Sequence, residues 1–183
     1  MLTANEILKQ IKLGNIDIDP FDINCLNPNS YNVHLADEII QYDKHIVLDM
    51  KKKDNRYTKK IIPESGLTLY PNTLYIGSIK ETVSSDKFIS AIDGRSSIGR
   101  LGMQVHLTAG FGDIGFSGKY TLEITVVVPL IVYPNFEVAQ VYFEKPDGEV
   151  DFLYHGRYQN QEGPTTSKSF ARTDSYNGYH YNK

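Results

Sequence analysis

The chain has 183 residues, 40% of them hydrophobic and 22% charged, which fits a single globular domain over 1–183 with a sizeable core. A net charge of -3 and an isoelectric point near 5.9 argue against a nucleic-acid polymer or an anionic membrane as partner, although a few arginines are enough to bind a small anion. The longest apolar run, near 124–133, is too short for a bilayer span, and with one cysteine, Cys25, and no recognisable signal peptide a cytoplasmic location is expected.

A short helix is expected at the N-terminus. Thr3 and Glu6 have the spacing of a capping box, in which each side chain bonds the backbone of the other. Apolar residues follow at helical intervals over 7–11, and Gly14 is a stop signal.

Most of the remaining chain reads as β-structure. Residues 27–30 have a turn pattern, and Tyr31, Val33 and Leu35 alternate as in a half-buried strand. Further strand-like runs cover 38–50, 66–79, 87–92, 103–109, 119–134 and 138–145. Clusters of Gly, Pro, Asn and Asp separate these runs at the short spacing of an all-β barrel or sandwich.

Two segments read as irregular. Residues 51–56 are expected to form a solvated, charged surface loop. The last segment, about 154–183, is rich in Gly, Ser, Thr, Asn and Gln with scattered aromatic residues. It is predicted to be mobile by itself and to become ordered against a ligand or a neighbouring subunit.

Arg95, Ser96 and Ser97 form the first group with chemical potential. Arginine offers a planar fork of donors, the hydroxyls donate to oxygens, and Gly94 and Gly99 allow backbone N–H groups to approach a ligand. Residues 96–101 fit one short helical turn facing an anion. The composition fits two interpretations, a phosphate-binding cradle and a polar turn that ends a strand.

The glycine-rich connection over 109–116 contains Asp113. An aspartate in such a turn usually bonds its own backbone as an Asx turn. The alternative is that its carboxylate accepts a hydrogen bond from a sugar hydroxyl, with an aromatic ring packed beneath the sugar. Both interpretations are open from the residues alone.

Glu123 lies inside the apolar run 119–134, where an ionised carboxylate is costly unless it is paired or has a chemical role. Alternation puts Glu123 and Thr125 on one face, and Leu122 and Ile124 on the other. That face is either solvated, or it lines a pocket in which Glu123, with Arg100 as partner, takes a proton from water.

Taken together, four motifs in this order resemble the dCTP deaminase branch of the dUTPase-like superfamily: GRSSIGRLG, HLTAGFGDIGFSG, TLEI and VAQVYFE. NPNSYNVHL (27–35) is similar to the family's early strand motif, and RYQNQEGPTTSKSF (157–170) to its C-terminal lid. The resemblance therefore spans nearly the whole chain. It implies a mainly β fold, a distorted jelly-roll-like β barrel of the dUTPase-like type with a short N-terminal helix. It also implies a homotrimer with active sites between subunits.

The resemblance implies a role for each site residue. Glu123 corresponds to the general base, and Ser96 and Arg100 help to orient it and the attacking water. Asp113 receives the 3′-hydroxyl of the deoxyribose, and the strand Thr121-Leu122-Glu123 reads the pyrimidine edge through its backbone. The remaining positions hold the nucleotide and its phosphates: Arg95, Ser96, Ser97, Gln140, Arg157 and Gln161, with Tyr154 as a weaker match.

The implied chemistry is hydrolytic deamination of dCTP to dUTP and ammonia. Zinc nucleobase deaminases need H-x-E and P-C-x-x-C motifs, which a chain with one cysteine lacks, so no zinc is expected in catalysis. Mg²⁺ is expected to arrive with the triphosphate, and dTTP is a candidate inhibitor. Residues 109–111 and Gln140 resemble the family type that continues to dUMP and pyrophosphate.

Some positions depart from the family pattern. Gly112 stands where isoleucine or valine is usual and is expected to loosen the turn that aims Asp113; Arg157 replaces lysine, and Asn32 replaces an acidic residue. His106 is interpreted as a satisfied strand histidine. Two other classes stay open: a dUTPase without deaminase activity, and a nucleotide-binding regulatory protein without turnover.

Overall fold

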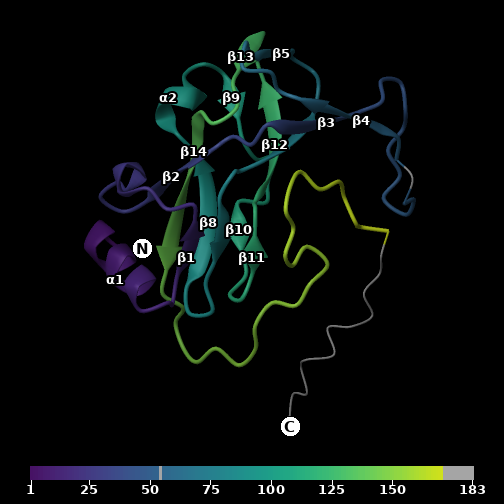
Figure 1. Cartoon of the computed structure of the whole chain (residues 1–183). Helices are drawn as coiled ribbons and strands as arrows, with labels where there is room; N and C mark the ends of the chain where they lie inside the picture. Colours follow the sequence, from purple (N-terminus) through teal and green to yellow (C-terminus); the bar gives the residue numbers. More distant parts are fainter. Residues whose placement is uncertain (54, 171–183) are drawn as a thin grey trace.

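A computed structural model describes residues 1–53 and 55–170, and strands dominate it (Figure 1). The strands form four sheets. The largest has the order β4 (Tyr57–Ile61), β3 (Glu38–Tyr42), β6 (Tyr75–Ser78), β12 (Thr121–Val126), β9 (Met103–Gln104), and the second has the order β10 (Phe111–Gly112), β8 (Ile89–Gly94), β14 (Glu137–Glu144), β2 (Tyr31–His34). The two small sheets are β1 (Asp17–Asp19), β7 (Thr82–Ser84), β11 (Ser117–Gly118), and the pair β13 (Leu130–Val132), β5 (Leu67–Leu69). The mainly β prediction is confirmed. The expected barrel is not closed, because no single hydrogen-bonded ladder joins these four sheets within the described residues.

The N-terminal helix is confirmed as α1 (Ala4–Lys12), which ends before Gly14 at a φ of 70°. The predicted capping box is wrong. Thr3 is the N-cap, but its side chain makes no capping bond, and Glu6 instead accepts a hydrogen bond from Gln10 Nε2 at 2.6 Å. The other helical pieces are the single turn η1 (Ile23–Cys25) and the predicted turn α2 (Ser96–Gly99).

Several predicted strands are shorter than their apolar runs. The run 119–134 divides into β12 and β13 at residues 127–129, where Val127 and Val128 are exposed and Pro129 has no N–H to donate. Strand β2 is buried on both faces rather than half-buried, since Asn32 lies in the interior between Tyr31 and Val33.

The hydrophobic core draws on most of these elements. Its largest fully buried side chains are Tyr31, Phe143, Ile7, Ile16, Leu35, Ile39, Ile40, Ile62, Leu69, Ile79, Leu122 and Ile124. In the described part of the chain, no helix has the length and apolarity needed to cross a membrane.

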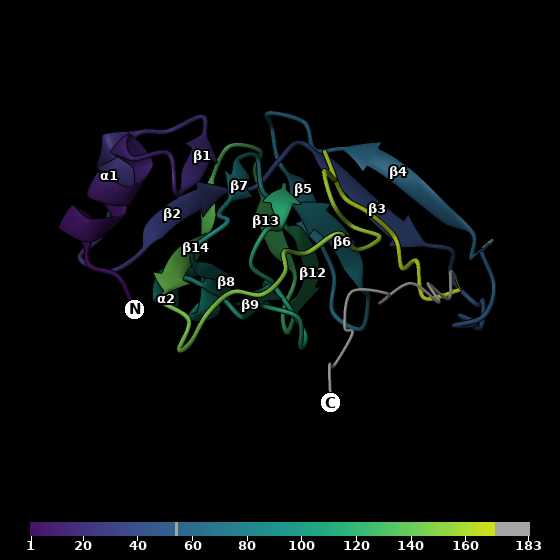
Figure 2. The same cartoon turned by 90° about the horizontal axis from the view of Figure 1, so that it is seen from below.

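The C-terminal segment up to residue 170 packs against the strands of its own chain (Figure 2). Gln161 forms a parallel bridge with Gly118 of β11, and the Thr165 N–H donates to Thr121 Oγ1 of β12 at 3.4 Å. Residues 154–170 thus lie against β11 and β12 of their own chain, and their ordering by a ligand or a neighbouring subunit stays a prediction. Residues 171–183 of the predicted tail lie outside the described part.

Candidate active site

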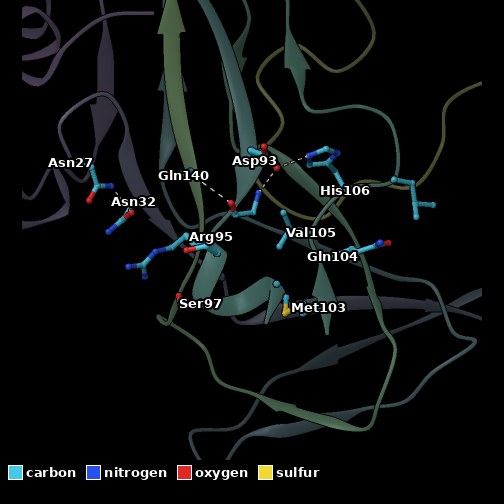
Figure 3. A pocket seen from close by; sticks show the side chains of 14 residues that line it. Asn27, Asn32, Asp93, Arg95, Ser97, Met103, Gln104, Val105, His106 and Gln140 are labelled. Atoms are coloured by element: carbon cyan, nitrogen blue, oxygen red, sulfur yellow. Dashed lines mark hydrogen bonds and ion pairs between the residues drawn. The ribbon is translucent and has the colours of Figure 1, made fainter. Parts of the chain in front are cut away.

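One cavity of about 770 Å³ is lined by three of the predicted phosphate-binding residues, Arg95, Ser96 and Ser97 (Figure 3). Arg95 follows the last residue of β8 and is the N-cap residue of α2, so the turn of α2 directs Ser96 and Ser97 to its rim. Both serines are exposed, which leaves their hydroxyls available to a ligand. Gln140 reaches the same cavity from the adjacent strand β14.

Arg95 is held in place by Glu137 at the start of β14. Its Nη1 donates to the Glu137 backbone oxygen at 3.2 Å and forms a close ion pair with Glu137 Oε2. Both side chains are about one-third exposed, at 27% and 31%. The guanidinium is therefore oriented on one side, and its remaining N–H groups are free to face the cavity.

A chain of hydrogen-bonded side chains along the cavity wall connects Arg95 with Gln140. Asn32 Nδ2 donates to Glu137 Oε2 at 3.2 Å, and Asn27 Nδ2 donates to Asn32 Oδ1 at 2.7 Å. Asn27 also approaches Ser30, whose hydroxyl donates to Gln140 Oε1 at 2.9 Å. The buried Asn32 thus supports the carboxylate that positions Arg95, which gives this departure from the family pattern a structural role.

A second cavity, of about 520 Å³, holds the predicted nucleoside-binding residues. This volume is in the range of small-molecule sites. Its lining includes Asp113, Thr121, Glu123, Tyr154 and Gln161, together with Phe111, Phe116, Tyr42, Tyr120, Tyr158, Thr165 and Ser167. Aromatic walls with a few polar groups suit the stacking of a base and a sugar.

Glu123 enters this cavity from β12, whose buried positions alternate as the sequence predicted. Its Oε2 accepts a hydrogen bond from the Leu107 N–H at 3.1 Å. Strand β6 pairs with Thr121–Ile124, whereas β9 pairs only with Thr125 and Val126. The β9-side edge of Thr121–Ile124 therefore carries no strand partner among the described residues, and its backbone can bond a ligand.

One predicted pairing is not formed within the chain. Arg100 is exposed and lines neither of these cavities, and no ion pair joins it to Glu123 in the described part of the structure. Ser96 also lies in the first cavity, whereas Glu123 lies in the second. The predicted residues that line a cavity are thus divided between two half-sites, the cradle around Arg95 and the cavity of Glu123.

Gly112 does not loosen a turn, so that expectation is wrong. It is a buried residue of β10 paired with Ser90 of β8, and a Cβ there would lie 1.8 Å from the hydroxyl of Tyr120. That hydroxyl bonds Ser90 Oγ at 2.6 Å, and burial raises the pKa of Tyr120 to about 12. Gly112 is therefore required by the packing that precedes Asp113.

The C-terminal segment places its predicted residues along the second cavity or beside it. Gln161 Nε2 donates to the Lys119 backbone oxygen at 2.7 Å, while its buried Oε1 has no hydrogen-bond partner among the described residues. The Tyr154 ring packs edge-on against Phe116. Arg157 does not line this cavity, and its Nη1 donates to the Lys168 backbone oxygen at 2.7 Å.

His106 differs from its interpretation as a satisfied strand histidine. It follows β9 outside any strand and lines the first cavity, where Nε2 lies 3.4 Å from Asp93 Oδ1 (Figure 3). Its Nδ1 is buried and has no partner in the described part of the chain. Sequence reasoning also missed Glu137, Asn27 and Tyr42, whose roles depend on contacts between distant segments.

Replacing Glu137 with glutamine tests its role in positioning Arg95. The loss of a partly exposed ion pair costs about 1 kcal/mol, so we expect KM for the nucleotide to rise about fivefold with kcat nearly unchanged. Steady-state kinetics check this split. Glu38→Gln, which removes the exposed pair with Lys59, is the matched control. A fall in kcat at constant KM would contradict the positioning role.

Comparisons with known proteins agree with these observations. Residues 1–146 match the family model described as dCTP deaminase-like. A protein of Clostridium beijerinckii described as "dCTP deaminase, dUMP-forming" is 50% identical over 89% of this chain and 92% of its own length. One of Hathewaya histolytica with the same description is 46% identical over 93% of this chain and 97% of its own. The crystal structure of the 2′-deoxycytidine 5′-triphosphate deaminase from Agrobacterium tumefaciens superposes with a TM-score of 0.63 and 18% identity. This superposition covers 79% of the present chain and 47% of the Agrobacterium tumefaciens chain, and it supports the assignment of the fold.

Proposed function

This chain belongs to the dCTP deaminase family, and from that premise we propose that it deaminates dCTP and hydrolyses the product to dUMP and pyrophosphate. The observation that carries the proposal is Glu123, a carboxylate directed into an aromatic cavity beside an unpaired backbone edge. The names of the relatives support the dUMP-forming type. A dUTPase without deaminase activity and a silent regulatory protein are less favoured.

In this proposal the pyrimidine lies against the free edge of Thr121–Ile124, and Asp113 accepts a hydrogen bond from the 3′-hydroxyl. The exposed carboxylate of Asp113 lines the same cavity as Glu123, which supports this placement. The triphosphate extends to Arg95, Ser96 and Ser97. Gln140 completes that cradle, while Gln161, Tyr154 and Arg157 of the C-terminal segment cover the nucleotide.

Deamination begins when Glu123 takes a proton from water, and the oxygen adds to C4 of cytosine. The carboxyl group returns the proton to the exocyclic nitrogen, the C4–N bond breaks, and ammonia leaves. A positioned acid–base group contributes about 10²- to 10⁴-fold to the rate. The Leu107 N–H, 3.1 Å from Oε2, supports the role by fixing the direction of the carboxylate.

For the second step, water attacks the α-phosphate and pyrophosphate leaves. Mg²⁺ bound to the triphosphate would neutralise charge on the leaving group. The first cavity suits a cation carried by the phosphates, because Asp93 is the only carboxylate among the described residues that line it, and Asp93 already accepts a hydrogen bond from the Gly94 N–H. Inhibition by dTTP, which shares the deoxyribose and the triphosphate, and a cytoplasmic location belong to the same proposal.

We place the complete site between the subunits of a homotrimer. Within one chain the cradle and Glu123 line separate cavities, so an interface that brings the cradle of one subunit to the Glu123 cavity of the next would complete both half-sites. The exposed apolar side chains of Leu101, Val127 and Val128 support such an interface.

A time course with dCTP and Mg²⁺ tests the function, with the nucleotides separated by chromatography. We expect dUMP and pyrophosphate to appear together without accumulation of free dUTP. Accumulating dUTP would remove the second step from the proposal. If dCTP stays intact while dUTP is cleaved in a parallel sample, the chain is a plain dUTPase, and if neither reacts, the regulatory alternative holds.

Mixing two inactive variants tests the shared site. Arg100→Ala and Glu123→Gln should each lack deaminase activity. After the two chains are unfolded together and refolded at equal amounts, about a quarter of the sites in random trimers combine a native Arg100 with a native Glu123 from the neighbouring subunit. We therefore expect about a quarter of the wild-type activity. No recovery, despite mixed trimers in native mass spectra, would place both residues in one chain's site.

A further inference from the structure

Three side chains that bind metals in other proteins meet outside the lining of both the Arg95 cavity and the Glu123 cavity. Cys25 ends η1, His34 ends β2, and Glu137 begins β14. His34 and Glu137 are direct partners in the antiparallel register of β2 and β14, so the pairing itself brings them together. The Cys25 sulfur lies 3.9 Å from Glu137 Oε1.

The spacing of these groups fits a small cation. One ligand atom from each of Cys25, His34 and Glu137 lies within 4.8 Å of the other two. Zinc binds sulfur at about 2.3 Å and nitrogen or oxygen at about 2.0–2.2 Å, so tetrahedral ligands lie roughly 3.3–3.7 Å apart. The three side chains need to move by only about 1 Å to enclose an ion of this size.

The surroundings of the cluster orient each ligand. Glu81, only 1% exposed, places Oε1 2.5 Å from His34 Nδ1, and its Oε2 accepts the His34 N–H at 3.0 Å. A carboxylate on Nδ1 fixes the tautomer that leaves Nε2 as the metal-binding nitrogen, as in carboxylate–histidine–zinc arrangements. Arg95 and Asn32 occupy Glu137 Oε2, which leaves Oε1 towards the sulfur.

The charges favour a divalent cation. Before an ion binds, the Glu81 and Glu137 carboxylates carry two negative charges against one positive charge from Arg95, and the Cys25 thiolate formed on binding adds a third. Cys25 is buried, while the His34 side chain is 23% exposed and gives an ion a path from solvent. An ion with a water as fourth ligand would balance this charge and tie η1 to the strands that carry Glu137.

We propose that Cys25, His34 and Glu137 form a binding site for a divalent cation of the zinc type, with Glu81 as the supporting carboxylate. The site takes no part in activating water, since Glu123 lines a different cavity. On binding, the thiol proton leaves to solvent and a sulfur–metal bond forms. Its effect is to fix Glu137, and through it Arg95, at the edge of the phosphate cradle.

Cobalt titration tests the site without nucleotide or activity. After treatment with a chelator, Co²⁺ is added to the full chain and the near-ultraviolet absorption is followed. A thiolate-to-cobalt charge-transfer band must come from Cys25, because the chain has no other cysteine. We expect this band to saturate at one ion per chain and to disappear when Zn²⁺, which binds such sites more tightly, is added.

Variants separate a built site from incidental binding. Cys25→Ser should abolish the band with the circular dichroism spectrum unchanged, and Glu81→Gln should weaken Co²⁺ binding about 10- to 100-fold. His155→Gln, at an exposed histidine elsewhere, is the control and should bind as the wild type does. Wild-type protein without a band, or a Co²⁺ affinity unchanged in Cys25→Ser, would mean an adventitious ion only and would overturn the proposal.

Discussion

Glu123→Gln is expected to lower the deamination rate by at least about 10²- to 10⁴-fold, because glutamine cannot take the proton of the attacking water. The substitution preserves the shape of the side chain, and the amide oxygen can still accept the Leu107 N–H. Nucleotide binding should therefore survive. Single-turnover kinetics with dCTP measure the first effect, and calorimetric titration with the nucleotide measures the second.

Glu144→Gln is the matched control, because Glu144 is an exposed glutamate at the end of β14. It should deaminate at the wild-type rate. If Glu123→Gln retains normal deamination, the general-base assignment is wrong. If both binding and turnover are lost, the side chain holds the nucleotide or the fold and its catalytic role is not demonstrated.

Gly112→Ala is expected to destabilise the protein by about 3 kcal/mol, the upper end of the cost of overpacking a core. The backbone at Gly112 has no left-handed φ, so the cause is the new Cβ, which would lie 1.8 Å from the Tyr120 hydroxyl and 2.9 Å from Ser90 Oγ. Since β10 leads directly into Asp113, the shift should also raise KM for the nucleotide. Urea unfolding gives the free energy, and steady-state kinetics give KM.

A double-mutant cycle with Tyr120→Phe identifies the contact. Tyr120→Phe alone loses the bond to Ser90, at a cost of about 1 kcal/mol. In the double variant the hydroxyl is gone, so the loss of stability should be smaller than the sum of the two single losses by roughly 1–2 kcal/mol. Strictly additive costs would show that Tyr120 is not the obstacle. Gly99→Ala, where no atom lies within 4 Å of the new Cβ, should cost no stability.

The sequence was sufficient for features that depend on local pattern. The helical interval over 7–11 predicted α1. The alternation around Glu123 predicted that Glu123 and Thr125 share one face and Leu122 and Ile124 the other, which the burial along β12 confirms. The family was predicted from ordered motifs and is confirmed by the matching model. The individual roles of Arg95, Asp113 and the other site residues stay predictions.

The missed features are contacts between residues far apart in the chain. Arg95 and Glu137 are 42 positions apart, and Ser30 and Gln140 are 110 apart, so no local periodicity encodes their meeting. The role of Gly112 depends on the Tyr120 hydroxyl, which bonds Ser90 of the strand paired with β10, so it too follows from tertiary packing. Sequence reasoning also missed the bridge between residues 154–170 and β11, since polar segments can dock through backbone hydrogen bonds that composition does not report.

Because the C-terminal segment bonds the chain next to β11, hydrogen exchange at one amide, that of Lys119, reports how often the segment separates from the strands. The Lys119 N–H donates to the Gln161 carbonyl at 2.9 Å, so its proton exchanges with solvent deuterium only in molecules whose segment has separated. The protection factor at Lys119 thus converts into a free energy of opening. A nucleotide held by both the strands and the segment would slow this exchange in proportion to its occupancy, without any label on the protein.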